Sequence, residues 1–593
     1  MVLHTEPHVF CQVLLHSSLL AFKFQLYFVI LHTKLKNMTR QIIMLLMLTA
    51  LSMPAQGTVK ARFSRPAWIT PAYVANPDAQ PAEDNDVEVP YLKGPRKVGS
   101  QATAPLKAKG SPLVPVILAQ FSDKRFTSGL GTDAEGNPLQ CQTPDDETVV
   151  NNLFTLFCNG QGDGSYYTGL GSYGSITEYF RDQSDGQFTP RFVVIGPVTL
   201  DSCAAFYGRN TPSKDANLSK FYQESIKKAQ EQYSEWSQFD NDGNGTVDMA
   251  FFIYAGEGEN GGGGAETIWP QERSSGGTIN GTRYGCYACC NETYKGKTDG
   301  IGVFVHELSH ALGLPDLYDT NYKLYGLDYW DVMDSGCYCN DGYCPCNYSA
   351  YEREFMGWSR LETLDADEPR ELTLYHSTSF YTHEYDWNAY KIVNPANSNE
   401  YYVIENRQSK GWDLYVGKGT ETTKMNGMIV FHVDYISSRW NSNTVNTQTT
   451  QLLTIRPADG VLDSYMDVSN IDEYRQWMFS TYGDLFPGYY KVTSFEGEQQ
   501  VVHTTTGDTP GRMGQPLYDI SLSDDGVISL YYMKGPRKPG DVNDDGSVNI
   551  TDVVEAINII AAGGYDAYAD VNGDSSVNIT DVVMIINIIA GTK

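Results

Sequence analysis

An eleven-residue stretch, residues 306–316, constrains this chain more than any other feature of its sequence. It reads His-Glu-Leu-Ser-His-Ala-Leu-Gly-Leu-Pro-Asp. His306 and His310 are four residues apart, so on a helix their side chains lie on the same face. Two imidazoles placed in this way can bind one zinc ion and leave room for a third ligand and a water molecule. Glu307 lies beside them and can accept a proton from that water, so the stretch predicts a zinc peptidase.

The third zinc ligand is expected just beyond this helix. Gly313 allows the helix to stop in a left-handed cap, and the following turn can bring Asp316 to the metal as an oxygen ligand. A glutamate from a later helix is the alternative, and Glu352 and Glu354 are the candidates. The short turn at Gly313 favours Asp316. Asp319 is expected to be a turn or solvent-exposed carboxylate.

The main alternative is a structural pair of core histidines. Histidine accounts for only 10 of the 593 residues, so a chance occurrence of this spacing is rare. Apolar residues at positions 308, 311 and 312 give the helix a buried side. In a purely structural pair Glu307 would be buried without a partner, which costs free energy. The metal site is therefore the favoured interpretation.

On these residues the chain resembles the immune inhibitor A family of secreted metallopeptidases, whose pattern is H-E-x-x-H-x-x-G-x-x-D. By this resemblance Met333 lies in a tight turn beneath the metal and packs there without being a ligand. The family has a histidine after Ile-Trp-x, where this chain has Gln271, and Gln271 is left out of the site. The resemblance spans residues 112–535 and is carried by residues 115–123, 240–256, 329–336, 355–358 and 400–408.

The resemblance implies a metzincin-like zinc peptidase domain in an α+β fold. In that chemistry zinc lowers the pKa of its bound water and polarises the scissile carbonyl. Glu307 then acts as general base and as proton carrier to the leaving amine. The oxyanion needs a further hydrogen-bond donor. Tyr318, Tyr325, Tyr329 and Tyr338 are candidates among which the sequence does not choose.

Length and charge exclude several classes of function. A chain of 593 residues is too long for one hydrophobic core, so we expect three or four domains. The formal net charge of −29 makes nucleic acids and anionic membranes unfavourable partners. The same acidic balance suits a soluble exported protein that binds calcium.

The amino-terminal sequence predicts export. Residues 1–57 are expected to hold an upstream extension and a signal peptide, with translation starting at Met38 and an apolar region at 42–51. The mature protein is then secreted or associated with the cell surface, and it is not an integral membrane protein after signal cleavage. A membrane anchor at residues 10–31 is the alternative. Residues 58–110 are rich in proline, alanine and charged residues and are expected to form a propeptide or leader.

Cysteine usage supports export. Ten of the eleven cysteines follow the expected cleavage site, and an even number is typical of paired cysteines. Two clusters, at residues 286–290 and 337–346, flank the zinc motif. Disulfides there would brace the rim of the active site in an oxidising compartment. Zinc bound by these thiolates is the alternative.

Calcium is the second predicted metal. Residues 240–248 alternate oxygen-bearing side chains around a glycine, as a calcium loop requires, and an apolar strand is expected at residues 249–255. An Asx-rich turn without a metal is the alternative. The predicted ligands of this one calcium ion are Asp240, Asp242, Asn244 and Asp248.

The carboxyl-terminal region contains a repeat. Residues 541–552 recur as residues 570–581, and an apolar helical run follows each copy, at 553–560 and 582–589. The oxygen side chains have the spacing of an EF-hand-like calcium loop, so up to two further calcium ions are expected. The predicted ligands are Asp541, Asn543, Asp545, Asn549 and Asp552 in the first loop and Asp570, Asn572, Asp574, Asn578 and Asp581 in the second.

These duplicated units resemble a dockerin module, which binds cohesin domains. Two departures from EF-hands are visible, because aspartate replaces the last glutamate of each loop and Ser575 replaces the turn glycine of the second. The module either tethers the chain to a cohesin-bearing scaffold or is a calcium-stabilised cap that packs on its own protein. The sequence leaves both interpretations open.

The expected domain order follows from these features. Residues 111–362 form the catalytic domain, 363–534 an antiparallel β domain, 535–540 a linker and 541–593 the small α-helical dockerin-like module. Within the β domain, His432 and Asp434 are expected to be structural.

The leading hypothesis is a secreted, calcium-stabilised zinc endopeptidase that hydrolyses proteins or peptides. A glycan-processing enzyme is one alternative, because dockerins often accompany such domains, but no paired-carboxylate site competes with the zinc motif. A catalytically inactive peptidase fold that serves in binding or adhesion is the other. The intact Glu307 argues against inactivity.

Overall fold

The computed structural model leaves the amino-terminal predictions untested. The signal peptide, the start at Met38, the alternative anchor at residues 10–31 and nearly all of the leader lie outside the described residues. Within the described part of the chain, no helix combines the length and the apolar character needed to cross a membrane. The described residues are 100, 103–163, 165–211, 215–420, 423–447, 450–462, 464, 466, 470, 480–504, 511–535 and 537–591.

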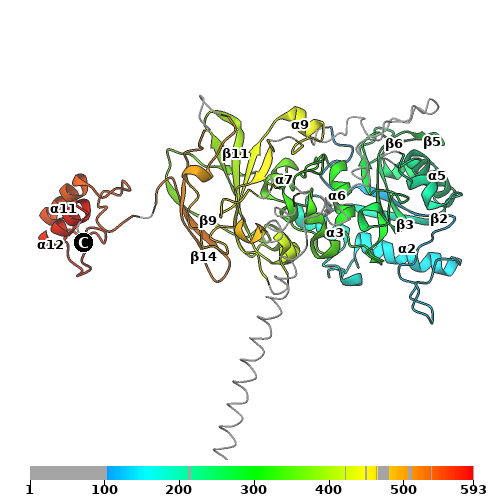
Figure 1. Ribbon diagram of the computed structural model, residues 1–593, viewed down its shortest axis with the longest axis horizontal. Helices are drawn as coiled ribbons and strands as arrows, with labels where there is room; N and C mark the ends of the chain where they lie inside the picture. Colours follow the sequence, from blue (N-terminus) through cyan, green and yellow to red (C-terminus); the bar gives the residue numbers. More distant parts are fainter. Residues whose placement is uncertain are drawn as a thin grey trace, which may run out of the picture. The chain divides into compact units, whose positions relative to one another are not determined.

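A seven-stranded mixed sheet is the frame of the region that contains the zinc motif (Figure 1). Its main path has the order β2-β1-β3-β6-β4, and β5 and β7 each pair with β6. The pairs β1–β2, β1–β3 and β3–β6 are parallel, whereas β4 is antiparallel to β6. The strands are β1 (Leu113–Gln120), β2 (Arg191–Thr199), β3 (Val247–Glu257), β4 (Gln271–Arg273), β5 (Thr278–Ile279), β6 (Thr282–Tyr294) and β7 (Lys297–Thr298).

Helices cover both faces of this sheet. Successive residues of a strand face opposite sides, and in β1 Val116 and Leu118 belong to one hydrophobic cluster while Ile117 belongs to another. Helices α2, α3 and α6 contribute to the first cluster and α5 to the second. The helices of this region are α2 (Pro144–Asn159), α3 (Ile176–Gln183), α4 (Ala204–Gly208), α5 (Leu218–Gln232), α6 (Gly302–Ala311) and α7 (Ala350–Phe355).

Two further sheets follow in the sequence, in the region predicted to be an antiparallel β domain. One has the order β13-β12-β11-β10-β8 and the other β14-β15-β9. All their pairings are antiparallel except the short parallel pair β8–β10. The elements are β8 (Glu362–Thr363), β9 (Arg370–Leu374), α8 (Ser379–Thr382), β10 (Tyr390–Asn394), β11 (Asn397–Arg407), β12 (Gly427–Asp434), α9 (Ser437–Asn441), β13 (Leu453–Ile455), β14 (Leu517–Leu522) and β15 (Ile528–Tyr532).

The two sheet regions share a hydrophobic core. In β12, Ile429 and Phe431 belong to the same cluster as the zinc-motif helix α6, whereas Met428 and Val430 face the three-stranded sheet. The period of two thus gives each face of β12 its own core. The catalytic region is therefore packed directly against the β region, across the domain boundary expected near residue 362.

A buried ion pair within the β region also contacts the catalytic region. Arg407, at the end of β11, places Nη2 2.6 Å from Asp413 Oδ1 and Nε 2.8 Å from Asp413 Oδ2, and neither side chain is exposed. The guanidinium also donates to the carbonyls of Trp330 and Asn347, each at 3.4 Å. Burial raises the pKa of Asp413, but Arg407 outweighs it and holds that pKa below its ordinary value. One cation thus holds both ends of the segment between Trp330 and Asn347.

The carboxyl-terminal unit has a hydrophobic core of its own. Its helices are α11 (Ile550–Ala562) and α12 (Ile579–Ile589), which include the two predicted helical runs. Each helix begins with a capping box, formed by Asn549 and Asp552 in α11 and by Asn578 and Asp581 in α12. The core consists of Val542, Val553, Ala556, Ala569, Val582 and Ile585.

We predict that Asp413→Ala lowers the free energy of unfolding by about 3–5 kcal/mol, because it removes the closer of the two buried carboxylates that contact the Arg407 guanidinium. Urea denaturation measures this change. The matched control is Asp201→Ala, which removes an ion pair with Lys228 at a side chain that is 81% exposed. Its effect is expected to stay within about 1 kcal/mol. Equal effects of the two substitutions would contradict the prediction.

Candidate metal centre

Helix α6 carries both histidines of the predicted site and is buried along its whole length. It is anchored on the sheet through Phe304, whose ring stacks on Phe251 of β3 with centroids 3.5 Å apart. This contact fixes the height of the helix above the sheet, and with it the positions of His306 and His310.

The helix ends in the cap expected at Gly313. The Gly313 N–H donates to His310 O at 2.9 Å and the Leu314 N–H donates to Ser309 O at 3.1 Å, which together form a Schellman motif. Gly313 has a φ of 106°, a conformation that residues with a side chain rarely adopt. The chain therefore reverses within a few residues of His310.

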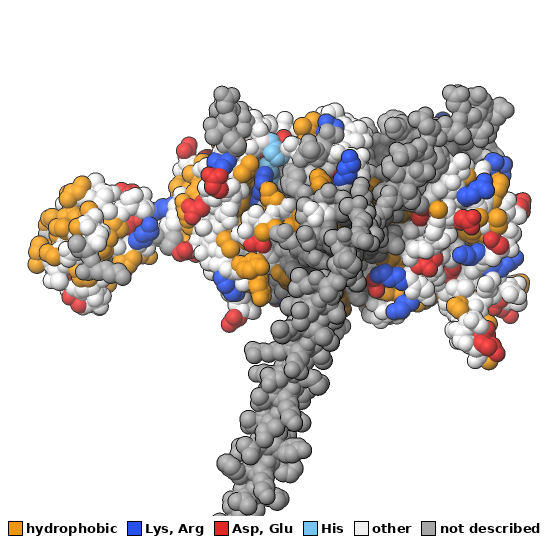
Figure 2. All heavy atoms as spheres, viewed as in Figure 1, with side chains coloured by type: hydrophobic (Ala, Val, Ile, Leu, Met, Phe, Trp, Pro, Cys, Tyr) orange, Lys and Arg blue, Asp and Glu red, His pale blue; other side chains and the backbone are white. Residues whose placement is uncertain are grey.

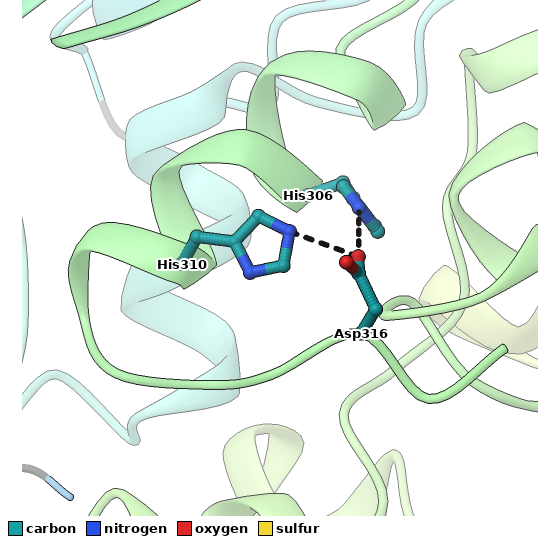
Figure 3. Close-up of side chains that lie close together, drawn as sticks. All are labelled: His306, His310 and Asp316. Carbon is teal, nitrogen blue, oxygen red and sulfur yellow. Dashed lines mark ion pairs between the residues drawn. The ribbon is translucent and has the colours of Figure 1, made fainter. Parts of the chain in front are cut away.

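Three side chains converge after this reversal (Figure 3). Asp316 Oδ1 lies 3.3 Å from His306 Nε2 and 3.0 Å from His310 Nε2. All three residues are buried, and one potential ligand atom of each lies within 4.8 Å of the others. The residues that the sequence places on a helix and a turn thus meet at one point.

Backbone carbonyls orient both imidazoles. His306 Nδ1 lies 2.9 Å from Val332 O, and His310 Nδ1 lies 2.8 Å from Leu314 O. A carbonyl can only accept a hydrogen bond, so Nδ1 carries the proton and Nε2 offers a lone pair. Imidazoles that bind metals are held by such outer hydrogen bonds. Both Nε2 atoms point towards Asp316, as Figure 3 shows.

The charges around the place where His306, His310 and Asp316 meet favour the binding of a cation. Burial lowers the pKa of His306, but its hydrogen bonds with Asp316 and Cys337 outweigh burial and raise that pKa well above the ordinary value. The buried carboxylate thus draws positive charge to the point where the three ligands meet. A divalent cation there would take the place of the proton.

The predicted turn at Met333 lies against both parts of the site. Val332 O accepts the hydrogen bond from His306, and Met333 O accepts the Leu317 N–H at 3.0 Å. The Met333 side chain is fully buried in the core that includes α6. Two successive carbonyls of one turn therefore hold a histidine on the helix and the loop that carries Asp316.

Glu307 lies in the wall of a pocket with about 500 Å³ of empty space that is partly open to solvent. Of the four candidate tyrosines, Tyr318 and Tyr338 line this pocket, whereas Tyr325 and Tyr329 do not. Asn260, Val303, Tyr322, Asp334 and Ser335 also line the pocket, and no motif in the sequence marks them as site residues. The lining residues are Asn260, Trp269, Pro270, Val303, His306, Glu307, Tyr318, Tyr322, Asp334, Ser335, Cys337 and Tyr338.

The alternative carboxylates do not join the converging group. Glu352 caps α7 by accepting the Ser349 N–H at 2.7 Å, and Glu354 forms an ion pair with Lys391. Asp319 accepts backbone hydrogen bonds within its own turn and is buried rather than solvent-exposed. Asp316 is therefore the carboxylate that accompanies the two histidines.

Gln271 has other partners, consistent with its omission from the site. Its side-chain amide donates to Asp215 Oδ2 at 2.9 Å and to Trp269 O at 3.0 Å. Two neighbours of Gln271, Trp269 and Pro270, line the pocket. Gln271 is not among the described residues that line it.

A second converging group consists of Glu400, His432 and His503. His432 Nε2 lies 2.9 Å from Glu400 Oε1, and Arg456 Nη2 lies 2.8 Å from His432 Nδ1. A guanidinium only donates, so His432 Nδ1 must accept and the proton of this neutral imidazole lies on Nε2. Burial lowers the pKa of His432 to about 4, which keeps it neutral. The lone pair that a metal needs is then absent from Nε2.

This second group is better explained as a structural network. Glu400 also accepts the Thr504 N–H at 2.9 Å, and His503 Nδ1 lies 3.0 Å from Asp434 Oδ2. These contacts fasten the segment at 503–504 to β11 and β12. The structural roles predicted for His432 and Asp434 agree with this arrangement.

The two groups should therefore differ in zinc binding. We predict that His310→Ala loses tight zinc binding because it removes one of three ligands. His432→Ala is expected to retain it. Equilibrium dialysis of the purified variants followed by metal analysis measures the difference. Retention of tight zinc by His310→Ala, or its loss from His432→Ala, would contradict the assignment.

The predicted calcium loop before β3 brings three carboxylates together. Asp240, Asp242 and Asp248 offer ligand atoms that lie within 4.8 Å of one another. Asp240 accepts the N–H groups of Asn244 at 2.9 Å and Gly245 at 2.8 Å, which wraps the loop around it. Burial raises the pKa of Asp248 to about 6, and the nearby charge of Asp242 adds to this effect. A bound cation would relieve the repulsion.

The two carboxyl-terminal loops have the same backbone pattern. Asp541 accepts the Asp545 N–H at 3.1 Å, and Asp570 accepts the Asp574 N–H at 3.1 Å and the Ser575 N–H at 2.8 Å. Ser575 has a φ of 68°, so the serine adopts the turn conformation expected of glycine. In the first loop, carboxylate oxygens of Asp541, Asp545 and Asp552 lie within 4.8 Å of one another.

None of the ten cysteines after the expected cleavage site forms a disulfide in the described part of the chain, and nine of them are buried. The disulfides expected around the active site therefore remain a prediction. The converging groups found among the described residues contain no cysteine, so they give no support to the alternative zinc site formed by thiolates.

Comparison with known families agrees with the two resemblances seen in the sequence. Residues 114–360 match the family described as Immune inhibitor A peptidase M6, catalytic domain. Residues 539–590 match the Dockerin type I domain. The resemblance to the peptidase family is confirmed, although this match ends at residue 360 and the expected similarity extended to residue 535.

Two curated relatives are similar to part of the chain. Pre-pro-metalloprotease PrtV of Vibrio cholerae serotype O1 is 28% identical over 246 residues, which cover 34% of this chain and 27% of that protein. Immune inhibitor A of Bacillus thuringiensis subsp. alesti is 28% identical over 234 residues, which cover 33% of this chain and 34% of that protein. The chain therefore matches only about a quarter to a third of the length of these relatives.

Proposed function

We propose that this chain, which contains a Peptidase M6 (immune inhibitor A) catalytic domain and a Dockerin type I domain, is a zinc-dependent endopeptidase that acts on proteins or peptides. One observation carries the proposal. Two imidazole lone pairs and one carboxylate converge beside a pocket whose wall contains Glu307. Two nitrogen donors and one oxygen donor suit zinc and leave a coordination position for water, as in catalytic zinc sites.

The chemistry of the site follows from its residues. When bound by His306, His310 and Asp316, zinc supplies a water molecule of lowered pKa and polarises a peptide carbonyl. The Glu307 carboxylate accepts the proton of that water and passes it to the nitrogen of the leaving amine. Aromatic side chains in the pocket wall restrict water around the reacting peptide. Of the four candidate tyrosines, Tyr318 and Tyr338 line the pocket, and we assign to one of them the role of hydrogen-bond donor to the developing oxyanion.

We predict that Glu307→Gln lowers casein cleavage by at least about 10²–10⁴-fold, because the amide cannot accept the proton. The glutamine has the same size, so zinc content should not change. A chelator of zinc should abolish wild-type activity. The matched control is Glu135→Gln, an exposed loop residue, which should cleave casein at the wild-type rate. Full activity of Glu307→Gln, or resistance of the active wild type to chelation, would contradict the proposal.

The alternative of an inactive peptidase fold that serves in binding or adhesion makes the opposite prediction. Such a protein would bind zinc but cleave neither casein nor gelatin. The proposed general base Glu307 is intact and buried in the wall of the pocket, which supports the enzyme.

We further propose that the dockerin unit binds a cohesin domain through an exposed apolar face. Ile550, Val554 and Ile557 of α11 are 66%, 54% and 48% exposed. Their counterparts in α12, Ile579, Val583 and Ile586, are 69%, 50% and 45% exposed. Figure 2 shows hydrophobic side chains gathered on the surface of this unit. Apolar side chains in such a cluster favour a protein partner.

The dockerin match and the signal-type sequence that ends near Gly57 together support an extracellular location. Calcium is proposed to stabilise the protein, with one ion in the loop at 240–248 and one in each carboxyl-terminal loop. In this proposal Asn244, Asn543, Asn549, Asn572 and Asn578 add neutral oxygen ligands to the carboxylates.

We predict that Asp541→Asn weakens calcium binding by the first carboxyl-terminal loop at least about tenfold, because it removes one ligand charge. Calcium titration calorimetry of the full chain measures this. Asp544→Asn is the matched control, since Asp544 lies in the same loop outside the predicted ligand positions and has a φ of 59° that asparagine also tolerates. An equal loss of affinity in both variants would contradict the ligand assignment.

A further inference from the structure

A short segment of the β region lies against the loop that carries Asp316. This segment, residues 443–447, begins just after α9 and is separated from the loop by more than 120 residues in the sequence. Asn446 Nδ2 donates to Leu317 O at 2.6 Å, and Asn321 Nδ2 donates to Thr447 O at 2.9 Å. The contact between segment and loop is therefore polar and runs along several residues of each.

Asn443 makes the contact that bears on the metal centre. Its Oδ1 accepts the Asp316 N–H at 2.7 Å, and its Nδ2 donates to Asp316 Oδ2. One amide thus binds both the backbone and the carboxylate of the same residue. This leaves Asp316 Oδ1 as the oxygen that faces His306 Nε2 and His310 Nε2. The amide selects which carboxylate oxygen is presented to the metal.

The position of Asn443 is itself fixed by a helix cap. The Asn443 N–H donates to Trp440 O at 3.1 Å and the Thr444 N–H donates to Arg439 O at 2.9 Å, which closes α9 with a Schellman motif. Asn443 has the left-handed φ of 55° that this position requires. Trp440 is fully buried, and its Nε1 donates to the Tyr351 hydroxyl at 2.6 Å. The cap is therefore anchored in the catalytic region.

We infer that Asn443 is a positioning residue for the zinc ligand Asp316, so that the β region helps to build the metal centre. The inference rests on the proposed zinc site. The Nδ1–H groups of His306 and His310 donate to carbonyls within the catalytic region, whereas the third ligand is held by a side chain from the β region. Outer hydrogen bonds of this kind fix the orientation of a ligand before the metal binds.

Asn443→Gly separates this role from a role in folding. Glycine is the residue most favoured at this position of a Schellman motif, so the cap of α9 is retained while the amide is lost. Asn280→Gly is the matched control. Asn280 also has a positive φ, of 47°, but is exposed in the hairpin between β5 and β6.

The experiment measures the zinc dissociation constant of the full chain by competition with a chelating indicator. Thermal unfolding is recorded for the same proteins with and without zinc. Asn443→Gly is expected to weaken zinc binding about 10- to 100-fold. It should also show a smaller rise in unfolding temperature on adding zinc. Its metal-free unfolding temperature should be close to that of the wild type, and Asn280→Gly should match the wild type in zinc affinity.

The outcomes distinguish this inference from the proposed function. If the wild type binds zinc tightly and Asn443→Gly binds it equally well, the role of Asn443 is wrong and the zinc site stands. If the metal-free unfolding temperature of Asn443→Gly collapses, Asn443 serves the fold and the positioning role is also wrong. If the wild type binds no zinc, the proposed zinc site is wrong and the inference is lost with it.

Discussion

The buried ion pair between Arg407 and Asp413 is the interaction on which the architecture around the metal centre depends. An ion pair out of water is costly unless its geometry is close to ideal, and here two short contacts join the guanidinium to one carboxylate. The remaining guanidinium hydrogens bind the Glu405 carboxylate and the carbonyls of Trp330 and Asn347. The chain between those carbonyls contains the turn at Val332 and Met333 and part of the pocket wall. A residue of the β region thus holds the ends of a segment on which the histidine orientation depends.

Two helix caps orient side chains of the proposed metal centre, and both are Schellman motifs. The cap after α6 contains Gly313 and presents the Leu314 carbonyl to His310, while the cap after α9 contains Asn443, whose side-chain amide binds Asp316. Both caps need a residue with positive φ, and each uses one of the residue types that tolerate it. The ligands are thus oriented by structure that exists without the metal. Such preorganisation lowers the cost of ordering the ligands when the metal binds.

Local features of the site could be predicted because they depend on short spacing. The four-residue interval between His306 and His310 and the turn at Gly313 require only helix geometry and the freedom of glycine. The two carboxyl-terminal loops repeat within one short region and could be recognised in the same way. The choice among tyrosines could not be made, because it depends on which hydroxyls reach a pocket formed by distant segments. The role of Asn443 could not be predicted either, because no sequence motif surrounds this residue.

The sequence by itself determined the features on which the proposed chemistry rests: a zinc-peptidase motif with Glu307 as the proposed general base, acidic loops proposed to bind calcium, and a dockerin unit. It also predicted a strand at residues 249–255 and an antiparallel β region after residue 362, where β3 and two further sheets are found. Only the tertiary structure decided which potential ligands have lone pairs to offer. His306 faces a carbonyl, whereas His432 faces the Arg456 guanidinium, and this difference decides which group is suited to a metal. The physical reason is that the proton on an imidazole is fixed by its neighbours in space, which sequence spacing does not specify.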